Sequence, residues 1–154
     1  MQYLCRFVYE RKMNMVEYSY PLTQTVADGE NVIFNNGDRC CKKGLITHKD
    51  SSGIFRIKGT GCKAIYKVHF NANIAIATGG TVEPISVSLV QNGETLNNAV
   101  AIATPAAIGD FWNVGFETFI ELPCGCCDTI SIRNTSATTA IDVVNANIII
   151  DRVA

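Results

Sequence analysis

Hydrophobic and polar residues alternate along much of the chain with the two-residue period of a β-strand. In residues 66–76 every even-numbered position is apolar, whereas the odd-numbered positions include Lys67 and His69. This pattern predicts a long strand with one buried face. Residues 85–89 alternate in the same way and precede the pair Asn92-Gly93, which suits the two positive-φ positions of a tight hairpin turn. We therefore expect an antiparallel hairpin here.

Further strands are expected on both sides of this hairpin. Residues 112–122 predict a long strand that Pro123 ends, with one apolar face formed by Trp112, Val114, Phe116, Ile120 and Leu122. The other expected strands are residues 31–35, 45–49, 53–58, 129–133 and about 140–152, separated by turn residues such as Asn36-Gly37-Asp38. Only residues 1–17 have a weak helical pattern. Eight to ten strands at this spacing favour an antiparallel sandwich or barrel.

Composition agrees with an all-β protein and excludes several classes. Isoleucine occurs 17 times, valine 13 times and leucine only 6 times, and β-branched side chains fit a pleated surface. The chain has 154 residues, of which 47% are apolar and 18% charged, as expected for one packed domain. A net charge of −1 argues against a nucleic-acid-binding protein. No apolar run is long enough to cross a membrane, so no membrane partner is expected.

The first residues stand apart from the strand pattern. Methionines at positions 13 and 15 precede the first alternating residues, and Arg6, Arg11 and Lys12 interrupt the segment before them. We interpret residues 1–20 as an N-terminal arm that attaches to a capsid or another partner, and residues 21–154 as the folded domain. A packed helix, or upstream sequence read from an early start codon, would also explain the first 14 residues.

Some strands are apolar on both faces, although a two-sheet sandwich buries only one. In the last strand Val144, Ala146, Ile148 and Ile150 share one face, and two aromatic residues lie opposite the apolar face of residues 112–122. A subunit interface is the simplest cover for the second face. The residues predicted to form it are Phe111, Phe119, Ile141, Val143 and Ile149. Alternatively, loops or the N-terminal arm cover them.

Charge is unevenly distributed along the chain. Residues 1–67 hold 11 of the 13 basic residues and carry a net charge of +5, whereas residues 68–154 carry −6. The basic residues are densest at Arg39, Lys42 and Lys43, which we predict to dock an acidic partner surface. A solvated edge without a partner is the alternative.

Seven cysteines leave at least one without a partner within the chain. They are reduced structural residues, disulfides or a metal site, for which Cys124, Cys126 and Cys127 are the candidate ligands. A cysteine nucleophile with His48 or His69 as base is a remote alternative, and no known catalytic motif is present. The acceptor pattern Asn134-Thr-Ser136 is interpreted as a chance match to a glycosylation site. We therefore predict no enzyme activity and no cofactor.

Several segments together resemble a known family. The segments are residues 66–74, 85–94, 113–116, 122–127, 130–134 and 144–153. They resemble the tumour-necrosis-factor-like (TNF-like) jelly-roll domains of spore-coat collagen-like proteins and of structural proteins of bacteriophages that infect Firmicutes. The resemblance covers about residues 20–154 and implies an all-β, antiparallel two-sheet jelly roll of about ten strands. It also implies a tight homotrimer without catalytic residues.

The absence of a Gly-X-Y collagen run favours the phage setting over the spore surface. In that setting the protein would be made in the bacterial cytoplasm and displayed on the virion surface as a head fibre or capsid decoration. Its partner would be a phage capsid or another virion protein. The alternatives are a spore-surface trimer and an adhesin that binds a host-surface glycan or receptor through Trp112 or the loops at 92–93 and 104–110. The alternation around Trp112 instead predicts a buried ring.

Overall fold

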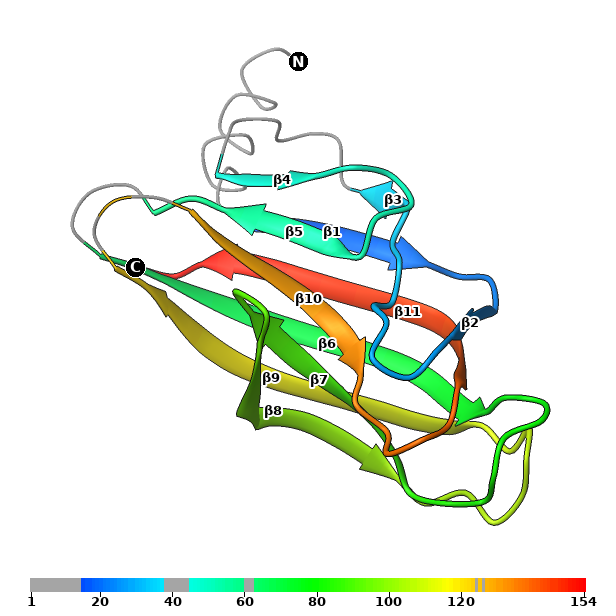
Figure 1. The fold of residues 1–154 in the computed structure, drawn as a ribbon. Coiled ribbons are helices and arrows are strands. Elements are labelled where there is room, and N and C mark those ends of the chain that lie inside the picture. The colour runs from blue at the N-terminus through cyan, green and yellow to red at the C-terminus, as the bar shows by residue number, and fades with distance from the viewer. Residues whose placement is uncertain (1–14, 38–44, 60–62, 124, 126) are drawn as a thin grey trace.

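The computed structural model describes residues 15–37, 45–59, 63–123, 125 and 127–154, which form eleven strands and no helix (Figure 1). The strands make two antiparallel sheets, so the predicted all-β sandwich is confirmed. Sheet A contains β1 (Met15–Tyr20), β2 (Gln24–Val26), β3 (Asn36–Gly37), β6 (Ala64–Ile76), β9 (Trp112–Leu122) and β11 (Ile141–Arg152). Sheet B contains β4 (Ile46–His48), β5 (Ile54–Ile57), β7 (Ile85–Gln91), β8 (Glu94–Ala103) and β10 (Asp128–Asn134).

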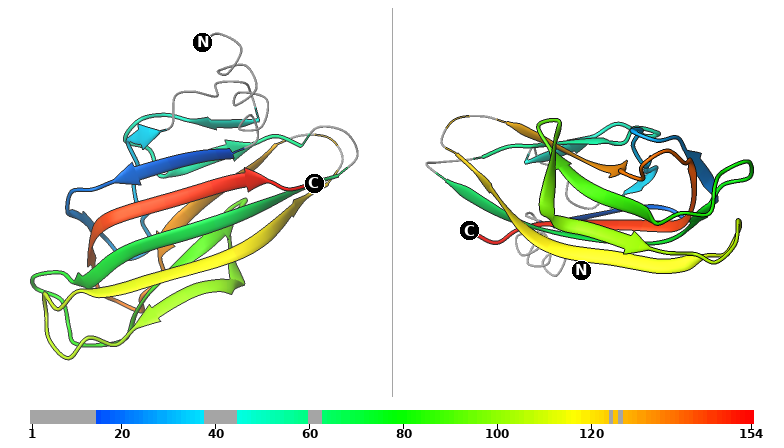
Figure 2. Two further views of the ribbon diagram at one scale, coloured as in Figure 1. Left: turned by 180° about the vertical axis from the view of Figure 1, so that it is seen from behind. Right: turned by 60° about the horizontal axis from the view of Figure 1, so that its bottom comes forward.

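The two sheets lie face to face as separate layers (Figure 2, right). In sheet A the order is β3-β1-β11-β6-β9, with β2 also paired to β11, and in sheet B it is β4-β5-β10-β7-β8. Strands distant in sequence are therefore neighbours in space: β11 lies between β1 and β6, and β10 lies between β5 and β7. The two longest ladders both involve β6: the β6–β11 ladder lies in the middle of sheet A and the β6–β9 ladder lies at one edge.

The core lies between the two sheets and follows the predicted alternation. In β6 the even-numbered residues from Ala64 to Ile76 are buried, whereas most odd-numbered residues are partly exposed. Aromatic rings fill the space near β5, where Phe34 and Phe55 pack with ring centroids 5.5 Å apart. Tyr66 is fully buried and its hydroxyl donates a hydrogen bond to the Lys58 carbonyl at 2.7 Å. Burial raises the pKa of this phenol.

The predicted hairpin between β7 and β8 is confirmed. Asn92 and Gly93 have φ angles of 51° and 85°, the pair of left-handed conformations that a type I′ turn requires. The Asn92 N–H donates to the Thr129 carbonyl at 2.9 Å, and Asn92 Oδ1 accepts the Thr129 N–H at 3.0 Å. The turn is thus attached to the neighbouring strand β10.

The N-terminal third differs from the predictions. Residues 15–17, predicted as weakly helical, belong to β1, which pairs with β11 from Met15↔Asp151 to Tyr20↔Ala146. Sheet A thus includes residues assigned to the arm, and the domain begins no later than residue 15. Residues 1–14 lie outside the described residues. The segment 31–35 makes only isolated bridges at Asn31 and Phe34, and Asn36–Gly37, predicted as a turn, forms β3.

The last strand contains a β-bulge that the sequence pattern did not reveal. Its pairing with β6 shifts between Val144 and Asn147, and Asn145 adopts a φ of 55°. The extra residue inverts the alternation, so that the side chains of Ile141 and Val143 face inward along with those of Ala146 and Ile148. Ile141 and Val143 are 0% exposed within a single chain. Their predicted place at a subunit contact is therefore wrong.

Candidate subunit interface

The outer face of sheet A, which points away from sheet B, is open to solvent. No described element crosses β1, β11, β6 or β9 on that side (Figure 2, left). Phe119, on the edge strand β9, is 61% exposed. Ile65, Phe119 and Val153 line a hollow of about 460 Å³ together with Ile120 and Glu121. We call Met15, Ile65, Phe119, Ile149 and Val153 the apolar patch.

Charged side chains lie beside the apolar patch on the same face. Lys67 and His69 from β6, Glu117 from β9 and Asp151 from β11 line a second hollow of about 330 Å³ with Met15 and Ile149. Glu117 accepts a hydrogen bond from Lys67 Nζ at 3.0 Å and lies 3.5 Å from His69 Nδ1. The hydrogen bond from Lys67 holds the pKa of the Glu117 carboxyl below its ordinary value.

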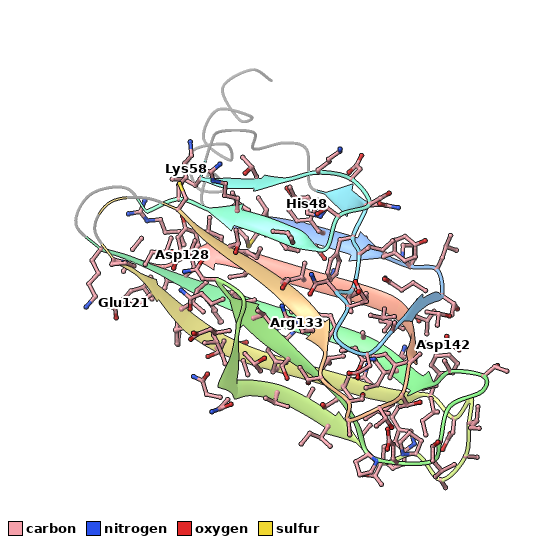
Figure 3. All side chains as sticks on the ribbon, in the orientation of Figure 1. His48, Lys58, Glu121, Asp128, Arg133 and Asp142 are labelled. Atoms are coloured by element: carbon pink, nitrogen blue, oxygen red, sulfur yellow. The ribbon has the colours of Figure 1, made fainter. Side chains whose placement is uncertain are left out.

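Next to it, Lys63 and Glu121 pair at 3.0 Å. Figure 3 shows Glu121 reaching outward from β9 at the edge of sheet A. Both side chains are more than half exposed, so this ion pair contributes little to stability.

Asparagine side chains gather on another part of the outer face. We call the five of them on β6, β9 and β11 the carboxamide band: Asn71, Asn73, Asn113, Asn145 and Asn147. Asn113 Nδ2 donates to Asn71 Oδ1 at 2.9 Å and to Asn73 Oδ1 at 3.0 Å. Asn73 Nδ2 donates to Asn145 Oδ1 at 3.2 Å, and Asn147 Nδ2 donates to Glu17 Oε1 at 2.7 Å. The band thus links β9, β6, β11 and β1.

Beside the band, Gly115 leaves a position of the outer face without a side chain. Gly115 pairs with Asn71 across the β6–β9 ladder and follows Asn113 on the same face. A Cβ atom at Gly115 would lie 2.7 Å from the Phe70 carbonyl oxygen, which is closer than real Cβ contacts allow. The close approach of the two backbones therefore requires glycine at this position.

Three of the predicted interface residues remain compatible with a subunit contact. Phe119 belongs to the apolar patch, Ile149 is partly exposed on the same face, and Phe111 is 45% exposed just before β9. Their contact with another subunit stays a prediction. Met15, Ile65 and Val153 were missed, although Ile65 and Lys67 share the odd-numbered face of β6, and this shared face was the available signal.

Most of the predicted metal and docking residues lie outside the described residues. Cys127 is disulfide-bonded, so its sulfur is not a free thiolate ligand, and Cys124 and Cys126 lie outside the described residues. Within the described ranges, no group of three histidine, cysteine or acidic side chains is placed to hold a metal ion. Arg39, Lys42 and Lys43 also lie outside the described residues.

The histidines have structural surroundings. His48 Nε2 lies 2.7 Å from the Ser52 carbonyl oxygen, and its ring stacks on Phe55 at 4.4 Å. His69 lies on the outer face, as its alternation predicted. Cys127, the one cysteine among the described residues, is oxidised, so the described part of the chain holds no cysteine–histidine pair. That same part contains no helix with the length and hydropathy needed to span a bilayer.

Trp112 contradicts the prediction of a buried ring, because it is 49% exposed. It is the first residue of β9 and thus lies at the rim of the sandwich, where its indole N–H donates to Asp110 Oδ2 at 3.1 Å. The loops named for glycan binding do not all gather there. The loop at 104–110 joins β8 to β9 beside Trp112, whereas Asn92-Gly93 turns at the opposite end of β7 and β8 (Figure 1).

Comparison with known proteins shows the fold. No protein-family model and no curated protein matches the chain in sequence. Among solved structures, the chain is similar to Eiger TNF from S. frugiperda, with a TM-score of 0.66, 14% identity and coverage of 92% of this chain and 94% of that one.

Two further structures are similar over nearly their whole length. The globular domain of zebrafish complement 1qA protein has a TM-score of 0.64 at 12% identity, covering 92% of this chain and 98% of that one. Murine APRIL has a TM-score of 0.60 at 13% identity, covering 90% and 98%. None of these three is a phage or spore-coat protein. The predicted fold is confirmed: the chain is a TNF-like jelly-roll sandwich.

Proposed function

We propose that this protein is a non-enzymatic structural protein that assembles as a homotrimer through the outer face of sheet A. We further propose that the trimer is displayed on a phage virion as a head fibre or capsid decoration. The trimer is inferred from the apolar patch around Phe119, which no described element covers. The Phe119 residue is 61% exposed in the single chain. A jelly roll used in this way acts through its shape and its contacts, without a catalytic centre.

Phe119 shares one hollow with Ile65 and Val153, and this grouping distinguishes it from the exposed apolar residues of sheet B. In sheet B, Ile54 on β5 and Ile102 on β8 are also exposed, but β10 and β7 separate the two strands. Single exposed apolar residues are ordinary on a protein surface, whereas a gathered patch indicates a contact. Each 100 Å² of apolar surface buried against another subunit contributes about 2.5 kcal/mol before the entropy of association is subtracted.

The virion assignment is supported by the sequence resemblance to phage structural proteins. The resemblance also supplies the trimeric state, because the jelly rolls of that class assemble around a threefold axis. A protein of this kind would be made in the bacterial cytoplasm and would bind a capsid or another virion protein.

Sedimentation of the purified chain at micromolar concentration tests the trimer. We expect a mass three times that of the chain, and a folded monomer would contradict the proposal. Phe119→Asp places a charge in the apolar patch and should abolish the trimer. Ile102→Asp, at a 67% exposed position on sheet B, is the matched control and should leave the mass unchanged. If Phe119→Asp fails to fold, chemical cross-linking of the wild-type chain across a dilution series gives the same answer.

The virion assignment has a separate test. Particles purified on a density gradient from the phage or prophage that encodes the chain should contain it in fixed stoichiometry with the major capsid protein. Immunogold labelling should mark the particle surface. Recovery of the chain only in spores, or only as free protein, would contradict a virion role.

A second candidate function is binding of a host-surface glycan. The exposure of Trp112 favours it, because an accessible indole ring beside the Asp110 carboxylate suits a sugar. A glycan array probed with the wild type and with Trp112→Ala tests this. Binding that the substitution removes would support an adhesin, and an array without any binding would contradict it.

A further inference from the structure

We propose that the carboxamide band lies inside the subunit contact and sets its register, with the outer face of another copy of this chain as its occupant. This inference rests on the proposed homotrimer and adds the polar part of the interface to the apolar part. The band and the apolar patch belong to one continuous surface. Both lie on the outer face of β6, β9 and β11, and no described element covers either (Figure 2, left).

Spare hydrogen-bonding capacity in the band is the first reason. A carboxamide offers two donors and an acceptor oxygen with two lone pairs. Asn71 uses its oxygen to accept from Asn113, but its Nδ2 has no partner among the described residues. Asn113 Oδ1 and Asn147 Oδ1 likewise have no donor there. The internal bonds therefore orient these side chains and leave both donors and acceptors available.

The neutrality of the band is the second reason. In a symmetric ring every copy carries the same side chains, so residues near the axis meet their own counterparts. Carboxylates or ammonium groups in that position repel one another, whereas carboxamides donate and accept at once. Lys67, Glu117 and Asp151 lie beside Met15 and Ile149 of the apolar patch instead, and Glu17 accepts the hydrogen bond from Asn147 at the border of the band.

The expected role follows from the energetics of polar contacts. An apolar patch by itself tolerates sliding and more than one stoichiometry, because burial of apolar area has no direction. A buried asparagine restricts a contact to the register in which its hydrogen bonds are made, at some cost in stability. The carboxamide band thus selects one arrangement among those that the apolar patch permits.

Asn71→Asp tests this with a minimal change. The substitution keeps the oxygen that accepts from Asn113 and replaces only the unbonded NH₂ with a negatively charged oxygen. Asn97→Asp is the matched control, because Asn97 is exposed on β8 in the other sheet. Trimer dissociation is measured by sedimentation for both variants and the wild type at about pH 7 and at about pH 4, near the ordinary pKa of an aspartate.

At neutral pH we expect Asn71→Asp to weaken trimer assembly at least about tenfold, since three like charges meet in the contact. At about pH 4 the new aspartate is partly protonated, so trimer assembly of Asn71→Asp should come much closer to that of the wild type. Asn97→Asp should assemble like the wild type at both pH values. In native mass spectra, Asn71→Leu should give trimers mixed with other stoichiometries, because it keeps the apolar contact and removes the polar selection.

The outcomes separate this inference from the proposed function. A monomeric wild-type chain contradicts both. A trimeric wild type that Phe119→Asp dissociates, together with Asn71→Asp and Asn71→Leu assembling like the wild type, overturns only the role of the band. Unchanged assembly with loss of glycan binding in Asn71→Asp would also overturn it, because the band would then face a sugar.

Discussion

Asparagine forms two networks in this protein, and they differ in how completely they are satisfied. Asn134 is 0% exposed, and its Nδ2 donates to the carbonyls of Val26 and Thr139, both at 3.0 Å. Its Oδ1 accepts the Ser136 N–H at 3.0 Å. In the carboxamide band, by contrast, Asn71 and Asn113 are exposed and each leaves one polar atom without a partner in the described chain.

The difference shows which contacts complete the fold and which are left for assembly. Asn134 joins the end of β10 to β2 and to the segment before β11, so both of its N–H donors and its oxygen have partners within the single chain. This burial also explains why the Asn134-Thr-Ser136 pattern is not an accessible glycosylation acceptor in the folded protein. The band holds its own geometry but is open to another molecule. Asn134→Ala and Asn113→Ala test this contrast directly, and two further substitutions test the surface around the band.

The largest effect is expected at Asn134. Asn134→Ala leaves two buried carbonyls and one N–H without partners and should lower the free energy of unfolding by about 3 kcal/mol. For a chain of this length the melting temperature should fall by roughly 6–12 °C. Differential scanning calorimetry at matched protein concentration measures the shift. A melting temperature within 2 °C of the wild type would show that the buried network is not required.

Gly115→Ala should have the next largest effect. The added methyl group meets the Phe70 carbonyl oxygen, a backbone atom that moves only with its strand, and we expect a loss of about 1–3 kcal/mol. Urea unfolding followed by circular dichroism measures it. Thr95→Ala, at an exposed position on β8, serves as control. Equal midpoints for the two variants would contradict the close approach of β6 and β9.

Asn113→Ala should cost much less than Asn134→Ala. Its bonds to Asn71 and Asn73 are exposed, so water replaces them when the side chain is removed. We expect a loss of about 0.5–1 kcal/mol in urea unfolding at the same chain concentration. A loss as large as that of Asn134→Ala would remove the distinction between the two networks.

The smallest effect is expected at the Glu117 ion pair. Folding lowers the pKa of the Glu117 carboxyl below its ordinary value. The stabilisation from its ion pair with Lys67 is therefore present above the unfolded pKa and is lost as pH falls through the folded pKa. Glu117→Gln should therefore melt slightly below the wild type at pH 7 and together with it in strong acid. Added salt should also narrow the difference. A difference that persists in acid would mean that Glu117 acts through packing.

Short-range pattern was sufficient for most of the fold. The even-numbered residues of β6 and the Asn92-Gly93 turn were predicted correctly, because alternation and turn chemistry are local properties. The bulge at Asn145 was not predicted, since an asparagine within a strand pattern does not reveal whether its backbone adopts a left-handed conformation. One extra residue then moved Ile141 and Val143 from a predicted contact into the core.

The outer face was only partly predictable. The sequence indicated a second apolar surface and included Phe119 and Ile149 in it. Met15 joined them through the pairing of β1 with β11, and Val153 through the hydrogen bond from its N–H to the Ile65 carbonyl. The carboxamide band likewise combines residues from β6, β9 and β11, which are separated by up to 76 positions.

The sequence by itself determined the class of structure, since a two-residue period and β-branched side chains allow little besides antiparallel sheets. Tertiary structure alone decided which apolar and amide side chains share a surface. That outcome depends on the order of strands in sheet A, where β11 lies between β1 and β6, and on a bulge that changes which face each residue occupies. The physical reason is that register is fixed by pairing between distant strands, and a shift of one residue exchanges the two faces.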